Sequence, residues 1–407
     1  MRQRMPKSSS AAAPHPNPNE RRCPYCSGAF NLELCEVVST APSKHVATGP
    51  QDLDAAQSAA VEEDTDLISR GGRPLLRPDS PVTQSGVIAP LASIAGPREN
   101  PRRECPSCNY VLPTDIDDRR LQTVGIVGAV AAGKTHFIAA AFHEATGSPL
   151  LSAHGLQSFR PDEETAKLFR EDYWKPFHHD RMALDATPQP QSLEMMAKPL
   201  LYRFEFEENR RRGFRTDVVQ VPCSLMLHDL PGEMLQNSES RRYYAPFLSA
   251  SETLILLVDP LGFAPVRDYI TMNFPEAAAI DKYNTQAALF NGVADELGGR
   301  LSETNVVVVI TKADLLGPAL GKSFSFDKPA SVSLLEHKAE MAAISSEVED
   351  LLLGRLCDNQ LNDALERFDP TMFHAVAAIG SQPIGTMVTE LRPKRVLDPL
   401  VSLFGLY

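Results

Sequence analysis

The 407-residue sequence contains no apolar run of the roughly 18 residues that a membrane-spanning helix needs. Its first 20 residues are basic but lack the apolar centre of a secretory signal peptide. Positive charge is also not in excess, since 40 Lys and Arg face 52 Asp and Glu for a net charge of −12. This balance excludes chain-wide attraction to nucleic acid or anionic lipid, although it leaves room for a local basic patch. We therefore expect a cytoplasmic protein with no membrane partner.

Cysteine is scarce, with seven residues, and four of them form two Cys-x-x-Cys pairs. Two residues between thiolates let one tight turn present both sulfurs to a tetrahedral ion, so two such turns complete a zinc site. A redox pair would precede a helix in a βαβ unit, and neither pair does so. The sequence predicts structural Zn²⁺, with Cys35 as an alternative ligand to one of the four. The predicted ligands are Cys23, Cys26, Cys105 and Cys108. A zinc ribbon of this kind binds protein or nucleic acid, and flanking arginines permit the latter.

Composition divides the chain near residue 115, because 15 of the 33 prolines lie before that point. Residues 1–20 are too polar and proline-rich to form a core and are expected to be disordered. Residues 21–35 and 104–115 carry the cysteines of the zinc ribbon. Residues 36–103 are expected to be a flexible insertion between them. The remaining chain, residues 118–407, is expected to be one α/β domain.

In residues 118–407, short apolar runs alternate with helical patterns. Continuous apolar strands alternating with helices predict a mostly parallel sheet covered on both faces, a three-layer α/β fold. Residues 144–186 are expected to form a helical insertion that carries Trp174, and Asp398 is expected to cap the last helix. The predicted strands are Leu121–Val127, Leu200–Phe206, Val218–His228, Thr253–Asp259, Asn305–Ile310 and Phe373–Ile379. The predicted helices are Lys134–Glu144, Ser240–Ser249, Tyr283–Leu297, Leu334–Leu353 and Pro399–Phe404.

The first chemical motif is GAVAAGKT, which matches the phosphate loop G-x-x-x-x-G-K-[ST] at every position. The glycines let the backbone curl around the β-phosphate, Lys134 reaches phosphate oxygens, and the Thr135 hydroxyl can bind Mg²⁺. The motif follows a predicted strand and opens a predicted helix, a context that an accidental glycine-rich turn lacks. The predicted nucleotide contacts are Gly128, Ala129, Val130, Ala131, Ala132, Gly133, Lys134, Thr135 and His136.

A second motif, DLPG, follows the strand that ends at His228. A carboxylate at this strand end lies beside the phosphate loop, where Asp229 would hold Mg²⁺ and Gly232 would turn its N–H toward the γ-phosphate. An ordinary Pro-Gly turn is the alternative. Because the motif comes about a hundred residues after a phosphate loop, we expect a sensor of the terminal phosphate.

A third motif, TKAD, follows the buried strand Asn305–Ile310. The Asp314 carboxylate offers both oxygens to the N1–H and N2–H₂ donors of guanine, a pair that adenine lacks. The stem of Lys312, which follows Thr311 in the motif, would lie over the plane of the base. A solvated surface turn is the alternative. The position of the motif favours a guanine nucleotide over ATP.

With these motifs in this order, residues 120–407 resemble the TRAFAC-type P-loop GTPases, and the domain resembles a G domain. The resemblance implies a threonine in the first switch loop, for which Thr187 is our choice as a further Mg²⁺ ligand and catalytic residue. It implies a backbone contact to guanine from Ala377 or Ala378. Where Ras-like proteins carry a catalytic glutamine, this chain has Glu233, and Thr311 replaces the commoner asparagine.

A zinc ribbon joined to such a domain resembles the bacterial double-GTPase group, which implies a role in conflict or defence systems. The leading hypothesis is a regulatory GTPase that uses Lys134, Thr187, Asp229, Gly232 and Glu233, and whose hydrolysis switches binding to an unidentified protein partner. The carboxylate of Glu233 would lie near the γ-phosphate charge, so hydrolysis is expected to be slow or partner-stimulated. The alternative is an assembly or adaptor module that binds GTP or ATP with little hydrolysis.

Overall fold

The structure is a computed structural model, and it divides into two compact units, Met1–Asp118 and Arg119–Tyr407. The structure describes residues 20–23, 28–32, 35, 37–39, 101–109, 111–113, 116, 119–184, 199–212, 215–229, 232, 241, 248–249, 251–274, 286–356, 358–381 and 385–404. Over this part of the chain, no helix combines the length and the apolar character needed to cross a membrane.

The first unit contains two small antiparallel ladders. β1 (Glu20–Arg22) pairs with β2 (Ala29–Asn31), and β3 (Val37–Ser39) pairs with β4 (Pro101–Arg103). The predicted tail and most of the predicted insertion, residues 1–19 and 40–100, lie outside the described residues. The two ends of that insertion are therefore paired strands.

The second unit is built on a seven-stranded sheet in the order β11-β10-β9-β5-β8-β7-β6. The four pairings from β11 to β8 are parallel, whereas β7 pairs antiparallel with both β8 and β6. This arrangement confirms the predicted mostly parallel sheet. The strands are β5 (Arg120–Gly128), β6 (Leu156–Pro161), β7 (Leu200–Arg212), β8 (Arg215–Asp229), β9 (Thr253–Val258), β10 (Asn305–Ile310) and β11 (Met372–Ala375).

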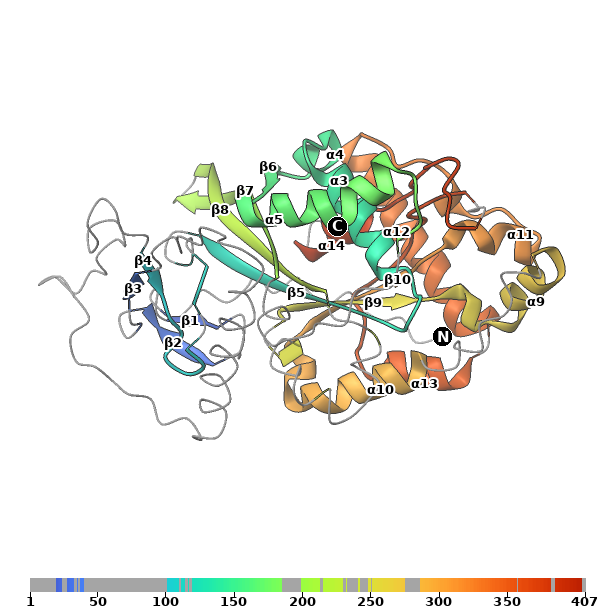
Figure 1. The fold of residues 1–407 in the computed structure, drawn as a ribbon, viewed down its shortest axis with the longest axis horizontal. Coiled ribbons are helices and arrows are strands. Elements are labelled where there is room, and N and C mark those ends of the chain that lie inside the picture. The colour runs from blue at the N-terminus through green and yellow to red at the C-terminus, as the bar shows by residue number, and fades with distance from the viewer. Residues whose placement is uncertain are drawn as a thin grey trace, which may run out of the picture. The chain divides into compact units, whose positions relative to one another are not determined.

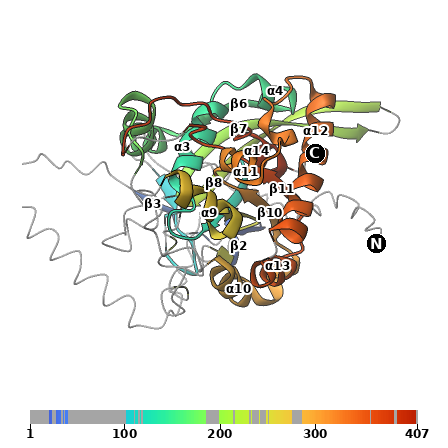
Figure 2. The same ribbon diagram turned by 90° about the vertical axis from the view of Figure 1, so that its right-hand side faces the viewer.

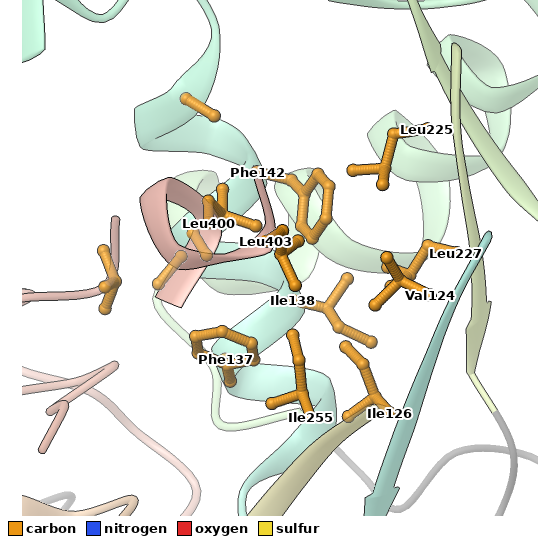
Figure 3. Packing of buried hydrophobic residues seen from close by; sticks show 14 of the residues in the cluster. Val124, Ile126, Phe137, Ile138, Phe142, Leu225, Leu227, Ile255, Leu400 and Leu403 are labelled. Carbon is orange, nitrogen blue, oxygen red and sulfur yellow. The ribbon is translucent and has the colours of Figure 1, made fainter. Parts of the chain in front are cut away.

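Helices cover both faces of this sheet, which gives the predicted three layers (Figures 1 and 2). On one side, α3 (Lys134–Ala145) and α14 (Asp398–Leu403) contribute to a single buried cluster. Figure 3 shows Phe137, Ile138 and Phe142 of α3 between the sheet and Leu400 of α14. The opposite side carries α10 (Gln286–Leu297) and α13 (Asn359–Glu366), which pack on each other.

The segment after α3 is not purely helical, contrary to the prediction for residues 144–186. After α4 (Pro149–Ala153), β6 joins the edge of the sheet by pairing with β7. The chain then forms α5 (Glu163–Leu168) and an 11-residue π-helix, η2 (Phe169–His179). The strand was not predicted because its two buried residues, Leu156 and Phe159, are three positions apart, so the period-two pattern of a strand is absent. A register shift between Gln157 and Arg160 accompanies this spacing.

The expected cap at Asp398 is also wrong. Asp398 is the first residue of α14 and is 1% exposed, and its carboxylate accepts a hydrogen bond from His337 Nε2 at 3.0 Å. His337 belongs to α12 (Leu334–Asp350) and also contacts His154 at 2.9 Å. A tertiary partner therefore replaces the local capping bond that the sequence favoured. The remaining helices are α9 (Ala264–Asn273) and α11 (Leu316–Leu320), with short helical turns η3 (Pro260–Gly262), η6 (Gly298–Ser302), η7 (Ala313–Leu315), η8 (Ser325–Asp327) and η9 (Leu351–Arg355).

Candidate functional site

The phosphate loop joins the end of β5 to the start of α3, the strand–turn–helix context that the motif predicts. Ala131 and Gly133 adopt the left-handed conformation, with φ of 62° and 81°. Alternation of backbone handedness turns successive N–H groups toward one concave side, which suits an anion. Ala132 N donates to Ala129 O at 3.1 Å and closes the turn. The α3 helix then begins at Lys134 and directs its N-terminal end toward the loop.

The lysine of the loop lies next to the carboxylate of the second motif. β5 and β8 are neighbours in parallel register, with Ile126 opposite Asp229. Lys134 Nζ is 4.0 Å from Asp229 Oδ1, and each side chain is only 7% exposed. Thr135 follows on the first turn of α3 and is half-buried. The fold therefore brings three predicted residues together, although the motifs are almost a hundred positions apart.

Gly232 lies directly against the backbone of the phosphate loop. A Cβ at this position would be 2.5 Å from Gly128 O and 3.0 Å from Val130 N. A real Cβ essentially never comes as close as 2.5 Å to another atom, so a side chain here would push the two segments apart. The glycine of the second motif is thus required by close backbone approach.

The third motif holds the phosphate loop from the other side. The buried Thr311 hydroxyl donates to the carbonyl of Ala132 at 2.7 Å. Lys312, with φ of 48°, extends its ammonium group to the carbonyl of Ala131 at 2.8 Å. Two consecutive carbonyls of the loop are therefore fixed by two consecutive residues of the motif, which orients the loop for its N–H groups to face a ligand.

Asp259 also binds Lys312, although it was not predicted as a site residue from the sequence. Lys312 Nζ is 2.7 Å from Asp259 Oδ2, whose side chain is 3% exposed. Gln286 exchanges two hydrogen bonds with the Asp259 backbone, at 2.7 and 3.1 Å. The sequence does carry a signal for it, because Asp259 directly follows a buried strand that neighbours β5. The carboxyl ends of parallel strands meet at one edge of a sheet, so this carboxylate lies near the phosphate loop.

Asp314 lies in η7 and borders an open hollow of about 490 Å³, whose lining includes Lys322, Asp327 and Lys394. Burial raises the pKa of the Asp314 carboxyl group, while its own backbone hydrogen bond and the charges of Lys394 and Lys312 act in the opposite direction. The residue therefore has room for a ligand beside it and cationic groups that favour its ionised form.

The predicted guanine-contacting alanines lie just past the end of β11. Ala313 N donates to Val376 O at 3.0 Å, which ties their loop to the third motif. Ala377 N already donates to Lys394 O at 3.1 Å. Because that N–H is used within the chain, Ala378 is the better placed of the two candidates.

His136 contacts the segment that leads to the predicted first switch. Its Nε2 accepts a hydrogen bond from Leu184 N at 3.0 Å, and its ring meets Phe177 edge-on at 5.3 Å. Burial, followed by the charge of Lys312, lowers the pKa of His136 to about 4, so the ring is neutral and can accept. Thr187 and Glu233 lie outside the described residues. His136 is thus an anchor near the site rather than an evident phosphate ligand.

A second residue missed in the sequence is Tyr173 on η2. Its hydroxyl donates to Asp229 Oδ2 at 3.3 Å. The sequence does carry a signal, because Phe169, Tyr173 and Phe177 recur every four residues and all three are buried. Such a stripe is typical of an ordinary core helix, and nothing in the sequence indicates that its central member reaches a carboxylate.

In the first unit, three of the four predicted zinc ligands converge. The sulfur atoms of Cys23, Cys105 and Cys108 all lie within 4.8 Å of one another. Cys23 Sγ is 3.7 Å from Cys108 Sγ, and Ser107 N donates to Cys105 Sγ at 3.4 Å. Cys26 lies outside the described residues. Cys35 is buried, with its sulfur 3.8 Å from Asn31 O, and is not one of the three clustered cysteines.

Comparison with known proteins gives a family model and a curated relative. The family model described as Double-GTPase 2 matches residues 122–361. A curated relative from Mycolicibacterium smegmatis is 22% identical over 404 residues, covers 93% of this chain and 97% of its own length, and bears the name "Putative ESX-1 scaffolding and assembly protein SaeC". The match extends over both units of the chain.

Solved structures also align with the chain, at low similarity. One is sup35 complexed with GDP, at 12% identity, with 71% of this chain and 46% of that chain covered and a TM-score of 0.27. Another is the S. cerevisiae Ski7 GTPase-like domain bound to GTP, at 12% identity, with 71% and 50% covered and a TM-score of 0.27. The chain thus spans about half the length of these solved proteins.

Proposed function

The chain belongs to the double-GTPase 2 family, and on this premise we propose that it binds GTP with Mg²⁺ and hydrolyses the nucleotide to control a protein contact. Membership confirms the predicted resemblance to the double-GTPase group and indicates GTP binding. The observation that carries the proposal is the convergence of Lys134, Asp229 and Gly232 on one loop. These groups come from two adjacent strand ends, where phosphoryl-transfer sites of this class lie.

Magnesium fits the residues at this point of the fold. Mg²⁺ prefers hard oxygen ligands and keeps several waters, so one hydroxyl and one carboxylate suffice as direct or water-mediated partners. Thr135 and Asp229 would hold the ion, with Thr187 as the proposed second hydroxyl. When bound, the ion neutralises charge on the phosphate oxygens. The low exposure of Asp229 strengthens its electrostatic interactions.

Guanine selectivity is assigned to Asp314, Lys312 and Ala378. A carboxylate that accepts from both guanine donors discriminates against adenine, which cannot supply them. The support is the fixed position of the third motif, because Thr311 and Lys312 are bound to the phosphate loop. The residues that contact the base would therefore be held at a fixed position relative to the phosphate loop.

The hydrolytic step is proposed to be slow or stimulated by a partner. Glu233 directly follows the glycine that touches the phosphate loop, so its carboxylate would be close to the γ-phosphate. The negative charges of the carboxylate and the γ-phosphate would repel each other, which disfavours the transition state unless a cation is added. The same observation supports the second candidate function, an assembly module that binds GTP and scarcely hydrolyses it.

A protein partner is proposed from two features. The Mycolicibacterium smegmatis relative is named as a scaffolding and assembly protein and aligns along nearly its whole length. The cysteine cluster is proposed to hold structural Zn²⁺ through Cys23, Cys26, Cys105 and Cys108, which would fold a small ribbon able to bind protein. We propose that the protein acts in the cytoplasm. From the resemblance to the bacterial double-GTPase group, we also propose a role in conflict systems.

Nucleotide competition tests the binding proposal. A fluorescent GTP analogue bound in MgCl₂ should be displaced by GTP at concentrations orders of magnitude below those of ATP. Lys134→Ala should abolish binding, and far-UV circular dichroism at the assay temperature checks that the variant is folded. Asp314→Asn should shift preference toward xanthosine triphosphate, since the amide reverses one donor–acceptor pair. Equal displacement by ATP and GTP would contradict the assignment.

Two further measurements address turnover and zinc. Single-turnover hydrolysis separates a GTPase from an assembly module, because the latter leaves bound GTP intact over hours. Metal analysis of the purified protein should find about one zinc per chain, and Cys105→Ser should lower it. Zinc-free protein with unchanged folding of the first unit would refute the ribbon.

A further inference from the structure

Tyr173 projects from η2 toward the carboxylate of the second motif. η2 packs on α3, and its buried face consists of Phe169, Tyr173 and Phe177. Phe169 stacks on the Tyr173 ring with centroids 5.4 Å apart and an interplanar angle of 12°. Phe177, which is fully buried, contacts the ring of His136. The tyrosine is therefore stacked on Phe169 within the buried face of η2.

The two oxygens of the Asp229 carboxylate have different neighbours. Oδ2 accepts the Tyr173 hydroxyl at 3.3 Å, and Oδ1 lies 4.0 Å from Lys134 Nζ. Tyr173 is 8% exposed, so its hydroxyl meets the carboxylate away from bulk water. A carboxylate oxygen only accepts, so the phenol O–H is the donor in this pair.

We propose that Tyr173 is a positioning residue of the magnesium site, whose hydroxyl binds Oδ2 and so holds Oδ1 of Asp229 toward the phosphate loop. A carboxylate on a free χ2 torsion samples a broad range of orientations, and one hydrogen-bonded oxygen removes most of that freedom. A hydrogen bond to a charged acceptor in a site with little water is strong enough to do this. The inference rests on the proposed GTP and Mg²⁺ binding.

This role links the segment between α3 and β7 to the nucleotide. After η2, the chain is held at Met182 N, which donates to Pro176 O at 2.9 Å, and at Leu184 N, which donates to His136. The Thr187 segment begins directly beyond these contacts. One helix therefore contacts the second motif through Tyr173 and fixes the approach to the predicted first switch.

The test uses Tyr173→Phe, which keeps the aromatic stack and removes only the hydroxyl. Release of a fluorescent GDP analogue from the full-length protein is measured over a MgCl₂ titration and in EDTA. The Mg²⁺ concentration that gives half-maximal slowing of release should rise roughly tenfold, the effect of losing one hydrogen bond to a charged group. Release in EDTA and the melting temperature of the nucleotide-free protein should change little.

Tyr202→Phe is the matched control. Tyr202 is 1% exposed and meets Phe169 edge-on at 6.5 Å, so it belongs to the same aromatic cluster. Its hydroxyl has no hydrogen-bond partner within the described part of the chain. The same deletion at Tyr202 should leave the Mg²⁺ midpoint at the wild-type value.

The outcomes separate cleanly. A raised midpoint in Tyr173→Phe alone supports the positioning role. An unchanged midpoint, or release that accelerates equally in EDTA and in Mg²⁺, overturns it and leaves the proposed function standing. Wild-type protein that shows no Mg²⁺-dependent nucleotide binding overturns both.

Discussion

The hydroxyl of Thr311 donates a hydrogen bond to the carbonyl oxygen of Ala132 across 2.7 Å, although the residues are 179 positions apart. Both residues are buried, so the bond is sheltered from water. Thr311 occupies the position where similar GTPases more often carry asparagine. A shorter side chain with one hydroxyl therefore still connects the base-side motif to the phosphate loop.

Loss of this bond should weaken nucleotide binding. Thr311→Val keeps the shape of the side chain but leaves the Ala132 carbonyl without its partner, at a cost of about 1–2 kcal/mol. We expect the Kd of a fluorescent GDP analogue to rise about tenfold. Thr311→Ser, which retains the hydroxyl, should stay near wild type. Equal affinities for the valine and serine variants would show that the hydroxyl does not stabilise the loop.

Gly232→Ala should uncouple the second motif from the terminal phosphate. The new Cβ would lie 2.5 Å from Gly128 O, so the motif must move away from the loop. The difference in dissociation rate between GDP and a non-hydrolysable GTP analogue should shrink, because the Gly232 N–H would lose the contact to the γ-phosphate that we propose for it. Gly299→Ala is the control, since no atom lies within 4 Å of a Cβ there. A variant that still distinguishes the two nucleotides as wild type does would contradict this contact.

The parallel part of the sheet was predictable because its strands are continuous apolar runs. Asn305–Ile310 was predicted with the bounds that β10 has, and the phosphate loop followed β5 as expected. Burial on both faces leaves such strands no polar positions, which makes their ends easy to recognise in a sequence. Each of the three motifs directly follows one of these strands, so its position at the end of a strand was predictable as well.

The polar extensions and long-range contacts were not predictable. β7 and β8 stay paired to Arg212 and Arg215, well past the apolar residues, because ladder hydrogen bonds do not require burial (Figure 2). Asp398 carries a capping signal, yet its partner is His337, 61 positions away. Tyr173 and Asp229 are 56 positions apart and meet only through the packing of η2. No local pattern encodes a contact of this kind.

The ion pair between Lys312 and Asp259 should stabilise the fold as well as the site. Lys312→Met leaves the Asp259 carboxylate buried without its cation, and the expected loss is about 3 kcal/mol in the free energy of unfolding. Asp259→Asn removes the charge that needs compensation, so the double variant should lose less than the sum of the single ones. Urea unfolding of the four proteins gives the coupling energy. Additive losses would show that the pair contributes no net interaction.

Acid should destabilise the protein through His136. Burial and the charge of Lys312 lower its pKa to about 4, against 6.5 for an unperturbed histidine. Between these values the unfolded chain binds a proton that the folded chain excludes, so the free energy of unfolding falls as the pH falls through this window. The His136 contribution is complete above pH 6.5 and amounts to at most about 3 kcal/mol between the two values. His374 contributes over the same pH range, because burial also lowers the pKa of its ring to about 4.

His136→Gln isolates this contribution, because the glutamine carbonyl can accept the Leu184 N–H but cannot ionise. Urea unfolding at pH 7, 6, 5 and 4.5 should give a shallower loss of stability for the variant than for wild type. Parallel curves for wild type and His136→Gln would mean that His136 does not resist protonation in the folded chain, and the neutral acceptor assigned to it would then be wrong.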